Sequence, residues 1–457
     1  AVLASASGRP SNSRGLTMED GLSKHYDELA ERDYNRSKAG LGSAAEEVEQ
    51  SRPAPRGGPR GGHSEGGGGD GRAVALHYNS LADRHRTLSS GSDILHLRNL
   101  NNWIKSVLIG QHMKRGHGVL DLACGKGGDL NKFKIGGVEH YVGIDIAGQS
   151  VRDAVHRFNG SDRHPPMKFA ATFCVGDFCR CDLEATLPRE LRFHLVSCQF
   201  ALHYSFVSEE SALRLLRNVA CRLQPGGVFV GTTTDANVLI RRLRAAPGLS
   251  FGNQHYAVTF DEAHASKRFP ASAPFGVRYR FSLQEAVDDC EEFLVHFPTL
   301  ERLALQCGLK LEARHNFTDF FAASWRGNKQ LLDKMRVLPE HGTISDAEWE
   351  VAHTYLAFAF RRLGPNGETV TRPPPPLSSA GATQRVTEAD ILWLEGGDGL
   401  TAAPAAHAAA AAAPAHAPAS RKRERGPAGA ESGRPAKAAN AGRPPPNIHT
   451  EQDSLFD

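Results

Sequence analysis

The stretch VLDLACGKGGDL at residues 119–130 constrains what this chain can fold into more than any other part of its sequence. Its apolar start, VLDL, is typical of the end of a buried strand. Three glycines, at 125, 127 and 128, precede a helix that we expect to begin near Asp129. Because glycine has no side chain and adopts positive φ readily, such a turn brings the main chain close to a ligand. The stretch predicts a strand–turn–helix unit with a binding site at its turn.

Strands and helices alternate through the rest of the central part. Apolar residues at three- and four-residue steps predict helices at 92–112, 149–158, 208–223, 236–244 and 297–308. Apolar runs predict strands at 118–122, 140–146, 169–177, 193–199, 225–234, 310–317 and 354–360, and a separate pair at 256–260 and 276–283. The alternation is typical of an α/β fold with a doubly wound, mostly parallel sheet, and we expect the late strands to extend it and include an antiparallel member.

Composition divides the chain into three parts. Residues 74–362 carry nearly all the aromatic side chains and are long enough for a full core. The Gly/Arg-rich residues 1–73 and the Pro/Ala-rich residues 363–457 hold too few large apolar side chains to offset the entropy lost on ordering. We expect both tails to be mostly disordered, with short helices near 19–34 and 390–395 as exceptions.

Charge, hydropathy and cysteine spacing exclude several classes of protein. The net charge is only +3, from 54 basic and 51 acidic residues, so the whole chain carries no strong signal for a polyanion partner. No apolar run is long enough to span a membrane. The closest cysteines, at 174, 179 and 181, lack a CxxC spacing, so we expect ordinary buried thiols and no metal site. Reduced thiols suit the cytosol or the nucleus.

Polar residues at successive strand ends narrow the choice of ligand. Asp145 ends the second strand and can accept hydrogen bonds from the ribose of either a nicotinamide dinucleotide or S-adenosylmethionine (SAM). The glycine order is AxGxGG, whereas dinucleotide enzymes favour GxGxxG, and Asp121 can face the cationic methionine end of SAM. Asp177 and Gln199 end the next two strands, with Asp177 where adenine would lie. Together these features favour SAM over NAD as the ligand. They also argue against the alternative that the glycines only make a tight turn and bind nothing.

Six ordered segments carry a resemblance to a known family: RNLNNWIKSVLI, LDLACGKGGDL, SCQFALHYSF, GTTTDANVLIRRL, EEFLVHFP and EWEVAHTYLAFAF. Over roughly residues 75–361 the chain resembles the eukaryotic mRNA cap guanine-N7 methyltransferases. The resemblance implies a Rossmann-like SAM-dependent methyltransferase fold, with a seven-stranded sheet and cap-binding insertions. It also implies transfer of a methyl group from SAM to N7 of the terminal guanosine of capped mRNA.

The resemblance also assigns roles to individual residues. The positions that match the family's cofactor contacts are Lys105, Ala123, Asp145, Asp177, Gln199 and Tyr204. Those that match contacts to the cap and its phosphates are Asn101, Asn102, Lys126, Lys132 and Arg157. The catalytic set, which encloses the methyl-accepting guanine, is His203, Glu292 and Tyr355.

Two departures from the family pattern are visible. Ala123 stands where the family usually has glycine. Its added methyl group would crowd the cofactor or demand φ < 0 unless the cofactor contact runs through the backbone, which is what we expect, so we expect the alanine to be tolerated. Residues 327–342 form a shorter segment than in the animal members, so a surface that binds an accessory activator there is expected to be altered.

The expected chemistry requires orientation and no general base. Guanine N7 has a free lone pair and loses no proton, so holding it in line with the methyl donor can supply about 7–11 kcal/mol. Glu292 can accept parallel hydrogen bonds from guanine N1–H and the 2-amino group, and its charge should help as the purine becomes cationic. His203 is assigned to guanine placement. Each position also has an ordinary structural explanation: a core histidine or tyrosine, a surface carboxylate, or a solvated helix charge.

The tails and the remaining alternatives complete the expectation. RGGPRGG resembles segments that bind RNA loosely, but with only two repeats we interpret it as a flexible linker. We interpret the basic cluster Arg421, Lys422, Arg423 and Arg425 as a nuclear import signal. We expect a nuclear monomer whose partner is the capped RNA 5′ end, with capping enzyme or RNA polymerase II machinery as candidate partners. The alternative functions are SAM-dependent methylation of another nucleobase or small molecule, and an inactive cap-binding scaffold.

Overall fold

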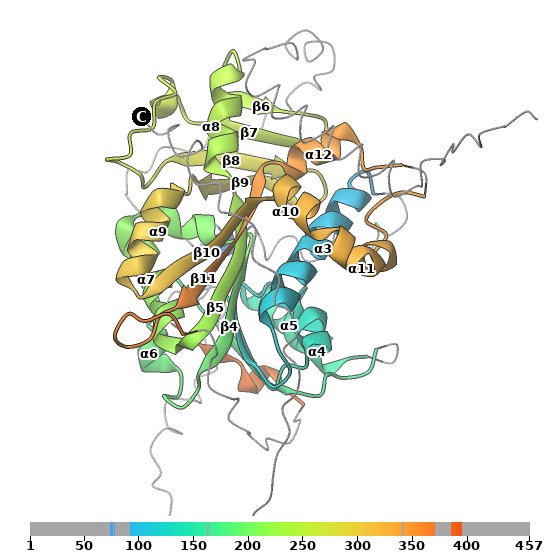
Figure 1. Ribbon diagram of the computed structural model, residues 1–457, viewed down its shortest axis with the longest axis vertical. Helices are drawn as coiled ribbons and strands as arrows, with labels where there is room; N and C mark the ends of the chain where they lie inside the picture. The colour runs from blue at the N-terminus through green and yellow to red at the C-terminus, as the bar shows by residue number, and fades with distance from the viewer. Residues whose placement is uncertain are drawn as a thin grey trace, which may run out of the picture.

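The computed structural model describes residues 74, 75, 77, 92–161, 164–340, 342–370 and 385–394. Its centre is an eight-stranded sheet in the order β10-β11-β5-β4-β1-β2-β3-β12 (Figure 1). The strands are β1 Gly118–Leu122, β2 His140–Asp145, β3 Ala170–Val175, β4 Phe193–Gln199, β5 Leu223–Thr234, β10 Leu309–Asn316, β11 Tyr355–Arg362 and β12 Leu392–Trp393. All are parallel to their neighbours except β11, which is antiparallel to both β5 and β10. The predicted doubly wound, mostly parallel sheet with an antiparallel member is confirmed.

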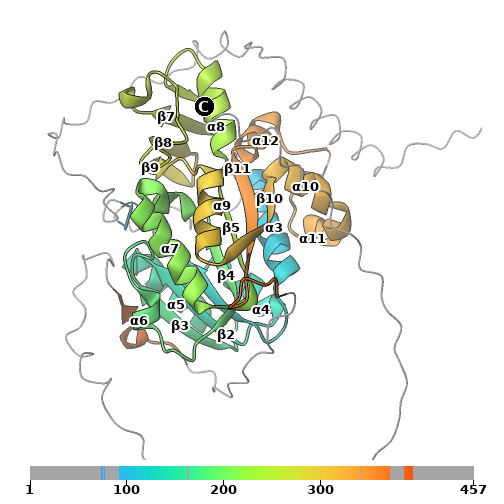
Figure 2. The same ribbon diagram turned by 60° about the vertical axis from the view of Figure 1, so that its left-hand side comes forward.

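Helices cover both faces of this sheet and enclose a hydrophobic core on each side (Figures 1 and 2). One face carries α3 Leu95–His112, α4 Leu130–Gly136 and α5 Gly148–Asn159; the other carries α6 Leu183–Thr186, α7 Glu209–Arg222 and α9 Phe297–Gln306. Their apolar residues recur at helical spacing, which places one stripe of each helix against the sheet. Polar caps define where helices begin: the Ser208 side chain, for example, accepts the backbone N–H of Ser211 at the start of α7.

A second, four-stranded antiparallel sheet lies beyond the carboxyl ends of the large sheet, together with α8 (Figure 1). Its elements are α8 Ala236–Ala245, β6 Ser250–Gly252, β7 Tyr256–Phe260, β8 Arg278–Leu283 and β9 Val287–Phe293. The predicted pairing of the segments around 256–260 and 276–283 is confirmed, and β9 adds a strand that we did not predict. The register of β8 and β9 sets Tyr279 opposite Glu292. This small sheet therefore brings a predicted site residue over the end of the large sheet.

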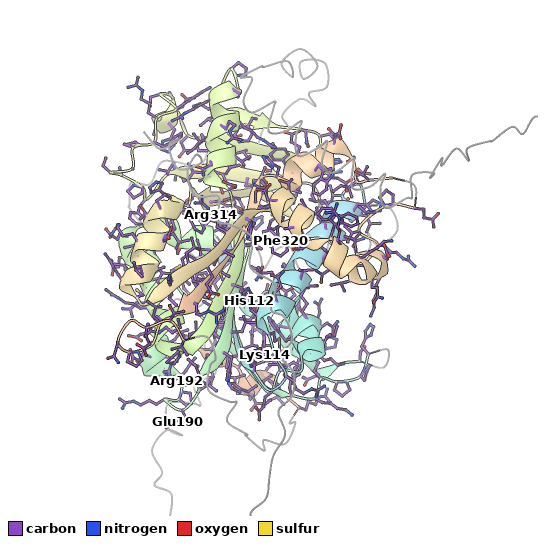
Figure 3. The ribbon with its side chains drawn as sticks, viewed as in Figure 1. His112, Lys114, Glu190, Arg192, Arg314 and Phe320 are labelled. Atoms are coloured by element: carbon purple, nitrogen blue, oxygen red, sulfur yellow. The ribbon has the colours of Figure 1, made fainter. Side chains whose placement is uncertain are left out.

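Three further helices complete the fold beside α3. They are α10 Phe317–Ser324, α11 Lys329–Lys334 and α12 Asp346–Ala352. Glu348, at the third position of α12, accepts a hydrogen bond from the backbone N–H of Leu97 at 3.0 Å and so attaches α12 to the start of α3. Figure 3 labels Glu190 and Arg192 at the amino end of β4 and Arg314 toward the opposite end of the sheet. The carboxyl ends of the parallel strands point to this second end, where the candidate site lies.

The segment near the C-terminus departs from expectation. Seven strands of the large sheet correspond to predicted ones, but β12 comes from residues 363–457, which we expected to be mostly disordered. The helix expected at 390–395 is wrong, because a 3₁₀ turn at Glu388–Asp390 leads directly into β12. The physical reason is the free edge of β3, whose unpaired backbone groups offer hydrogen bonds to an Ile-Leu-Trp segment that suits a strand. The expected helix near 19–34 and the basic cluster lie outside the described residues.

Candidate functional site

The glycine turn follows β1 and is fastened to the end of β2 by Asp145. One carboxylate oxygen, Oδ2, accepts the backbone N–H of Gly125 at 2.8 Å, and the other, Oδ1, accepts that of Ala147 at 2.9 Å. Asp145 is buried, and burial raises its pKa to about 6 even though both N–H groups favour the ionised form. The expected ribose carboxylate is thus a structural part of the turn as well as a candidate ligand contact.

Ala123 has a left-handed backbone conformation, with φ of 58°. The alternative that alanine demands φ < 0 here is therefore wrong. The turn needs this conformation because β1 must change direction toward Gly125 and Gly127, which also have positive φ. An L-residue in this region is strained by roughly 1–2 kcal/mol, so the rest of the turn holds Ala123 in place against its own preference.

Space and charge around the turn fit a cationic nucleoside. A Cβ atom built on Gly125 or Gly128 would meet no atom within 4 Å, so the turn faces open space. Three acidic side chains, Asp121, Asp145 and Asp177, lie at or just beyond the ends of three adjacent strands, β1, β2 and β3. Asp121 is buried and accepts a hydrogen bond from Tyr141, and burial together with the charge of Asp129 raises its pKa to about 8. A nearby sulfonium would favour the ionised form of these carboxyl groups, whereas the phosphates of a dinucleotide would disfavour it, so the cluster suits SAM better than a diphosphate.

A buried charge cluster joins α3 to the turn. Asp129 pairs with Lys105 at 2.9 Å and with Lys132 at 2.6 Å, and Lys132 also reaches Asn102 Oδ1 at 3.4 Å. Burial alone would raise the pKa of Asp129, but the two lysines hold it near 2. From the sequence we predicted only that a helix begins near Asp129. The position of Asp129 directly after the glycines could have identified it as a candidate site residue. Beside the cluster, the buried Oδ1 of Asn101 has no hydrogen-bond partner among the described residues.

Phe200 connects this charge cluster to the aromatic side of the site. It follows Gln199 at the end of β4 with φ of 56°, a rare conformation for a bulky residue. Its ring lies 5.9 Å from Lys105 Nζ and 5.0 Å from the ring of Tyr355. Strained residues of this kind cluster at functional sites. No pattern along the chain signals this backbone strain.

A buried hydrogen-bond network surrounds Glu292. The hydroxyl of Tyr279 donates to Glu292 Oε2 at 2.7 Å and also contacts Thr234 Oγ1 at 2.8 Å. His203 Nε2 lies 3.5 Å from Glu292 Oε1, and its Nδ1 lies 3.4 Å from Thr233 Oγ1. Burial raises the pKa of Glu292 to about 7 against the opposing effect of Tyr279, and lowers that of His203 to about 3. His203 is therefore neutral at physiological pH, and Glu292 is balanced between its two forms.

The sequence profile of the mRNA (guanine-N(7))-methyltransferase domain matches residues 63–363. The chain belongs to this family. The mRNA cap guanine-N(7) methyltransferase 1 of Oryza sativa subsp. japonica is 42% identical over 327 residues, which cover 67% of this chain and 88% of the relative. Its namesake in Arabidopsis thaliana is also 42% identical, over 64% of this chain and 82% of the relative. The mRNA cap guanine-N(7) methyltransferase of Drosophila melanogaster is 38% identical, over 66% and 79%.

The methyltransferase gathers six of the fourteen predicted site residues into two connected groups. The first joins Lys105, Lys132 and Asn102 around Asp129. The second joins His203 to Glu292, and Tyr204 to His203 by an edge contact at 4.4 Å between ring centroids. Tyr204 also contacts Cys290 Sγ through its hydroxyl at 3.4 Å. Phe200 contacts Lys105 of the first group and the ring of Tyr355.

Other predicted residues of the methyltransferase hold its backbone or pair elsewhere. Gln199 bonds to Ser197 and Thr232 within the sheet, and Asp177 accepts the N–H of Cys179. Lys126 pairs with Asp153 at 3.4 Å, and the exposed Arg157 donates to the carbonyl of Gly127 at 3.1 Å.

The helix charges on α8 differ from expectation. From the sequence, the basic cluster Arg241, Arg242 and Arg244 is typical of a solvated helix face, with RNA binding as the lesser alternative, but Arg242 pairs with Glu350 at 3.2 Å and donates to the Tyr256 hydroxyl. It therefore connects α8 to α12. None of the helices in the described part of the chain combines the length and apolarity needed to cross a membrane. Within the same residues, no three His, Cys, Asp or Glu side chains are arranged to hold a metal ion.

Proposed function

We propose that this protein methylates N7 of the terminal guanosine of capped mRNA and takes the methyl group from SAM. Membership of the family and its similarity to named cap methyltransferases support the reaction. The observation that supports guanine as the acceptor is Glu292, a buried carboxylate whose Oε1 faces the buried Nε2 of His203. A carboxylate in such a place is costly unless donors satisfy it, and guanine offers two adjacent donors, N1–H and the 2-amino group.

Residues around Glu292 orient the acceptor and move no proton. The Tyr279 hydroxyl donates to Glu292 Oε2, which leaves Oε1 and the remaining lone pairs of the carboxylate for guanine. His203 is a weak base because burial lowers its pKa to about 3, which suits placement of the purine. Tyr355, buried against Phe200, provides a flat ring at the same site. The negative charge of Glu292 stabilises the purine as it becomes cationic.

The glycine turn and its neighbours hold the donor in this proposal. When bound, SAM supplies an electrophilic methyl group on a sulfonium that is itself the leaving group. Asp145 has lone pairs left to accept from the ribose, since a carboxylate offers about four acceptor positions and two are in use. Asp177 takes the adenine end, and Gln199 and Tyr204 border the same strand ends. Lys105 pairs with the methionine carboxylate, and Asp129 holds the Lys105 side chain in place.

In this proposal the basic residues beside the glycine turn bind the cap phosphates. Lys132 with Asn101 and Asn102 forms one side, and Lys126 and Arg157 the other. If these side chains neutralise phosphate, added salt weakens capped RNA binding more than SAM binding. We also propose that the protein acts in the nucleus as a monomer, and that capping enzyme or RNA polymerase II machinery are its further partners.

Methyl transfer from labelled SAM to GpppRNA, followed by digestion to nucleosides, tests the proposal. Label in 7-methylguanosine supports it; label in another nucleoside supports the broader nucleobase methyltransferase. No label with retained cap binding supports an inactive scaffold.

Glu292→Ala tests the assignment of the acceptor site. We expect kcat/KM to fall at least about 30-fold, because two guanine donors lose their partner at about 1–3 kcal/mol each, while SAM affinity changes little. The matched control is Glu291→Ala, which removes the neighbouring carboxylate that pairs with Arg278 on the other side of β9. If Glu292→Ala stays active, the proposed recognition of guanine is wrong.

A further inference from the structure

Residues 385–394 lie along the free edge of the large sheet, beside β3 (Figure 2). We call this segment the C-terminal strap. Leu392 pairs with Cys174 and Trp393 with Val175 in a parallel ladder, and the backbone N–H of Leu394 donates to the carbonyl of Val175 at 2.8 Å. The strap thus adds the eighth strand next to the residue at which β3 ends.

The strap is attached at a second place by specific contacts to α5. The side-chain amide of Asn159 donates to the carbonyl of Val386 at 2.6 Å and accepts the N–H of the same residue at 3.1 Å. Arg152 pairs with Glu388 at 3.5 Å, and its guanidinium lies 6.0 Å from the ring of Trp393. Val386 is buried. A two-residue ladder, two polar attachments and two buried apolar side chains, Val386 and Ile391, make a smaller interface than those of the other strands, so the strap is expected to open at lower free energy than the rest of the sheet.

Leu394 contacts the backbone at Gly176, where the ends of β2 and β3 carry Asp145 and Asp177, two of the proposed SAM contacts. We call this part of the site the Asp145–Asp177 corner. Gly176 separates Val175 from Asp177, and its N–H donates to the backbone carbonyl of Asp145 at 2.9 Å. A Cβ atom on Gly176 would lie 2.7 Å from Leu394 Cβ, and its next two neighbours are also atoms of Leu394. The side chain of Leu394 therefore packs directly on the backbone that positions Asp145 and Asp177.

We propose that the C-terminal strap is part of the SAM site: Leu394 braces the Asp145–Asp177 corner, so that docking of the strap and binding of SAM stabilise each other. This inference rests on the proposed function. Coupling of this kind is reciprocal, because whatever affinity the docked strap adds for the ligand, the ligand adds to docking of the strap. The protein's own C-terminal region then sets how tightly the enzyme holds its methyl donor.

Calorimetry of the full chain with S-adenosylhomocysteine tests the proposal. We expect Leu394→Gly to weaken binding about 5-fold or more, the lower end of typical coupling between sites. Leu392→Gly is the matched control: it removes the same side chain and adds the same backbone freedom two residues earlier in the strap, but Leu392 is 41% exposed. Equal affinity of Leu394→Gly and the control would overturn the proposal.

A double-mutant cycle separates bracing from a direct effect on the site. Gly176→Ala forces Leu394 away in the full chain, so we expect weaker binding of S-adenosylhomocysteine. In the Leu394→Gly background the three atoms nearest to the added methyl group are gone, so Gly176→Ala should have little further effect. Equal losses in both backgrounds would mean that the methyl group acts on the ligand directly, and would overturn the proposal.

Hydrogen exchange of the unaltered protein supplies a measurement that needs no variant. We expect S-adenosylhomocysteine to slow exchange at the Leu394 amide and its neighbours in the strap, and an unchanged rate would overturn the coupling. If the unaltered protein does not bind S-adenosylhomocysteine at all, the proposed function itself fails. If it binds normally and the strap variants bind equally well, only the inference about the strap fails.

Discussion

Tyr279→Phe removes a single hydroxyl group behind the proposed guanine contact. Tyr279 is fully buried, and its hydroxyl lies 2.7 Å from Glu292 Oε2. Burial raises the pKa of Glu292 to about 7, and the hydrogen bond from Tyr279 acts against that rise. Without the hydroxyl, the ionised carboxylate loses a donor in a place that water reaches poorly. The pKa of Glu292 must therefore increase.

The size of the shift follows from the strength of that hydrogen bond. A hydrogen bond to a charged group contributes about 1.5–3 kcal/mol, and one pKa unit corresponds to about 1.4 kcal/mol. The pKa of Glu292 should rise by about 1–2 units in the variant. At pH 7 the ionised fraction then falls from about one half to about a tenth or less. Only the ionised form of Glu292 accepts hydrogen bonds from both guanine donors, so kcat/KM should rise with pH as Glu292 ionises. In Tyr279→Phe this rise should occur at higher pH.

The assay is kcat/KM for GpppRNA at saturating SAM, measured from pH 5.5 to pH 9.5. At neutral pH we expect Tyr279→Phe to lose about 5- to 50-fold, and near the upper end to regain most of the unaltered activity. Asp121 and Asp145 also titrate, with pKa values raised by burial, but they are common to both enzymes. The difference between the two profiles therefore reports Glu292.

Tyr256→Phe is the control for loss of a tyrosine hydroxyl from the same small sheet. Its hydroxyl donates to Glu350 at 3.0 Å and has no contact with Glu292. We expect its pH profile to coincide with that of the unaltered enzyme. If Tyr279→Phe lowers the rate equally at every pH, Tyr279 acts through packing alone and the electrostatic argument is refuted.

Three further substitutions test the turn, the charge cluster and the cost of burying Glu292. Ala123→Gly should raise the free energy of unfolding by about 0.5–1 kcal/mol in urea titrations, because relief of left-handed strain exceeds the added freedom of the unfolded chain; a decrease would contradict the strain. Asp129→Asn leaves Lys105 and Lys132 buried without their counter-charge and should destabilise the fold by about 3 kcal/mol or more, and an unchanged melting temperature would count against the cluster. Glu292→Gln should grow more stable relative to the unaltered protein as pH rises. The folded pKa of about 7 exceeds the ordinary value of 4.5, so the native carboxyl loses stability between these pH values, on the order of 3 kcal/mol in all; parallel stability–pH curves would refute this.

The order of strands and the carboxylates at their ends were predictable because both follow from patterns along the chain. In a parallel sheet the carboxyl ends of the strands meet at one edge, so Asp145 and Asp177 were expected together from spacing alone. Asp145 also holds the N–H of Gly125, a contact twenty residues away that the turn itself requires. At Asp145 the pattern along the chain and the tertiary contact therefore both require a carboxylate.

The parts that sequence did not predict depend on contacts between distant segments. Tyr279 acts on Glu292 because β8 and β9 pair in one particular register, and a shift of one residue would turn the hydroxyl to the other face. The strap joins β3 across more than two hundred residues, and its two-residue strand carries little periodic signal. The left-handed conformation of Ala123 also follows from the path of the turn, since alanine alone would favour negative φ.

If Glu292 recognises guanine as we propose, the network around it explains how a site without a general base can still depend on pH. Burial favours the neutral carboxyl, whereas guanine recognition needs the carboxylate, so the free enzyme is balanced between the two forms. Guanine shifts the balance, because its N1–H and 2-amino groups donate to the ionised form only. Methylation at N7 then adds positive charge beside that carboxylate and favours it further. Adenine lacks this pair of donors and would leave Glu292 free to protonate, so the same burial that raises the pKa also discriminates between the two purines.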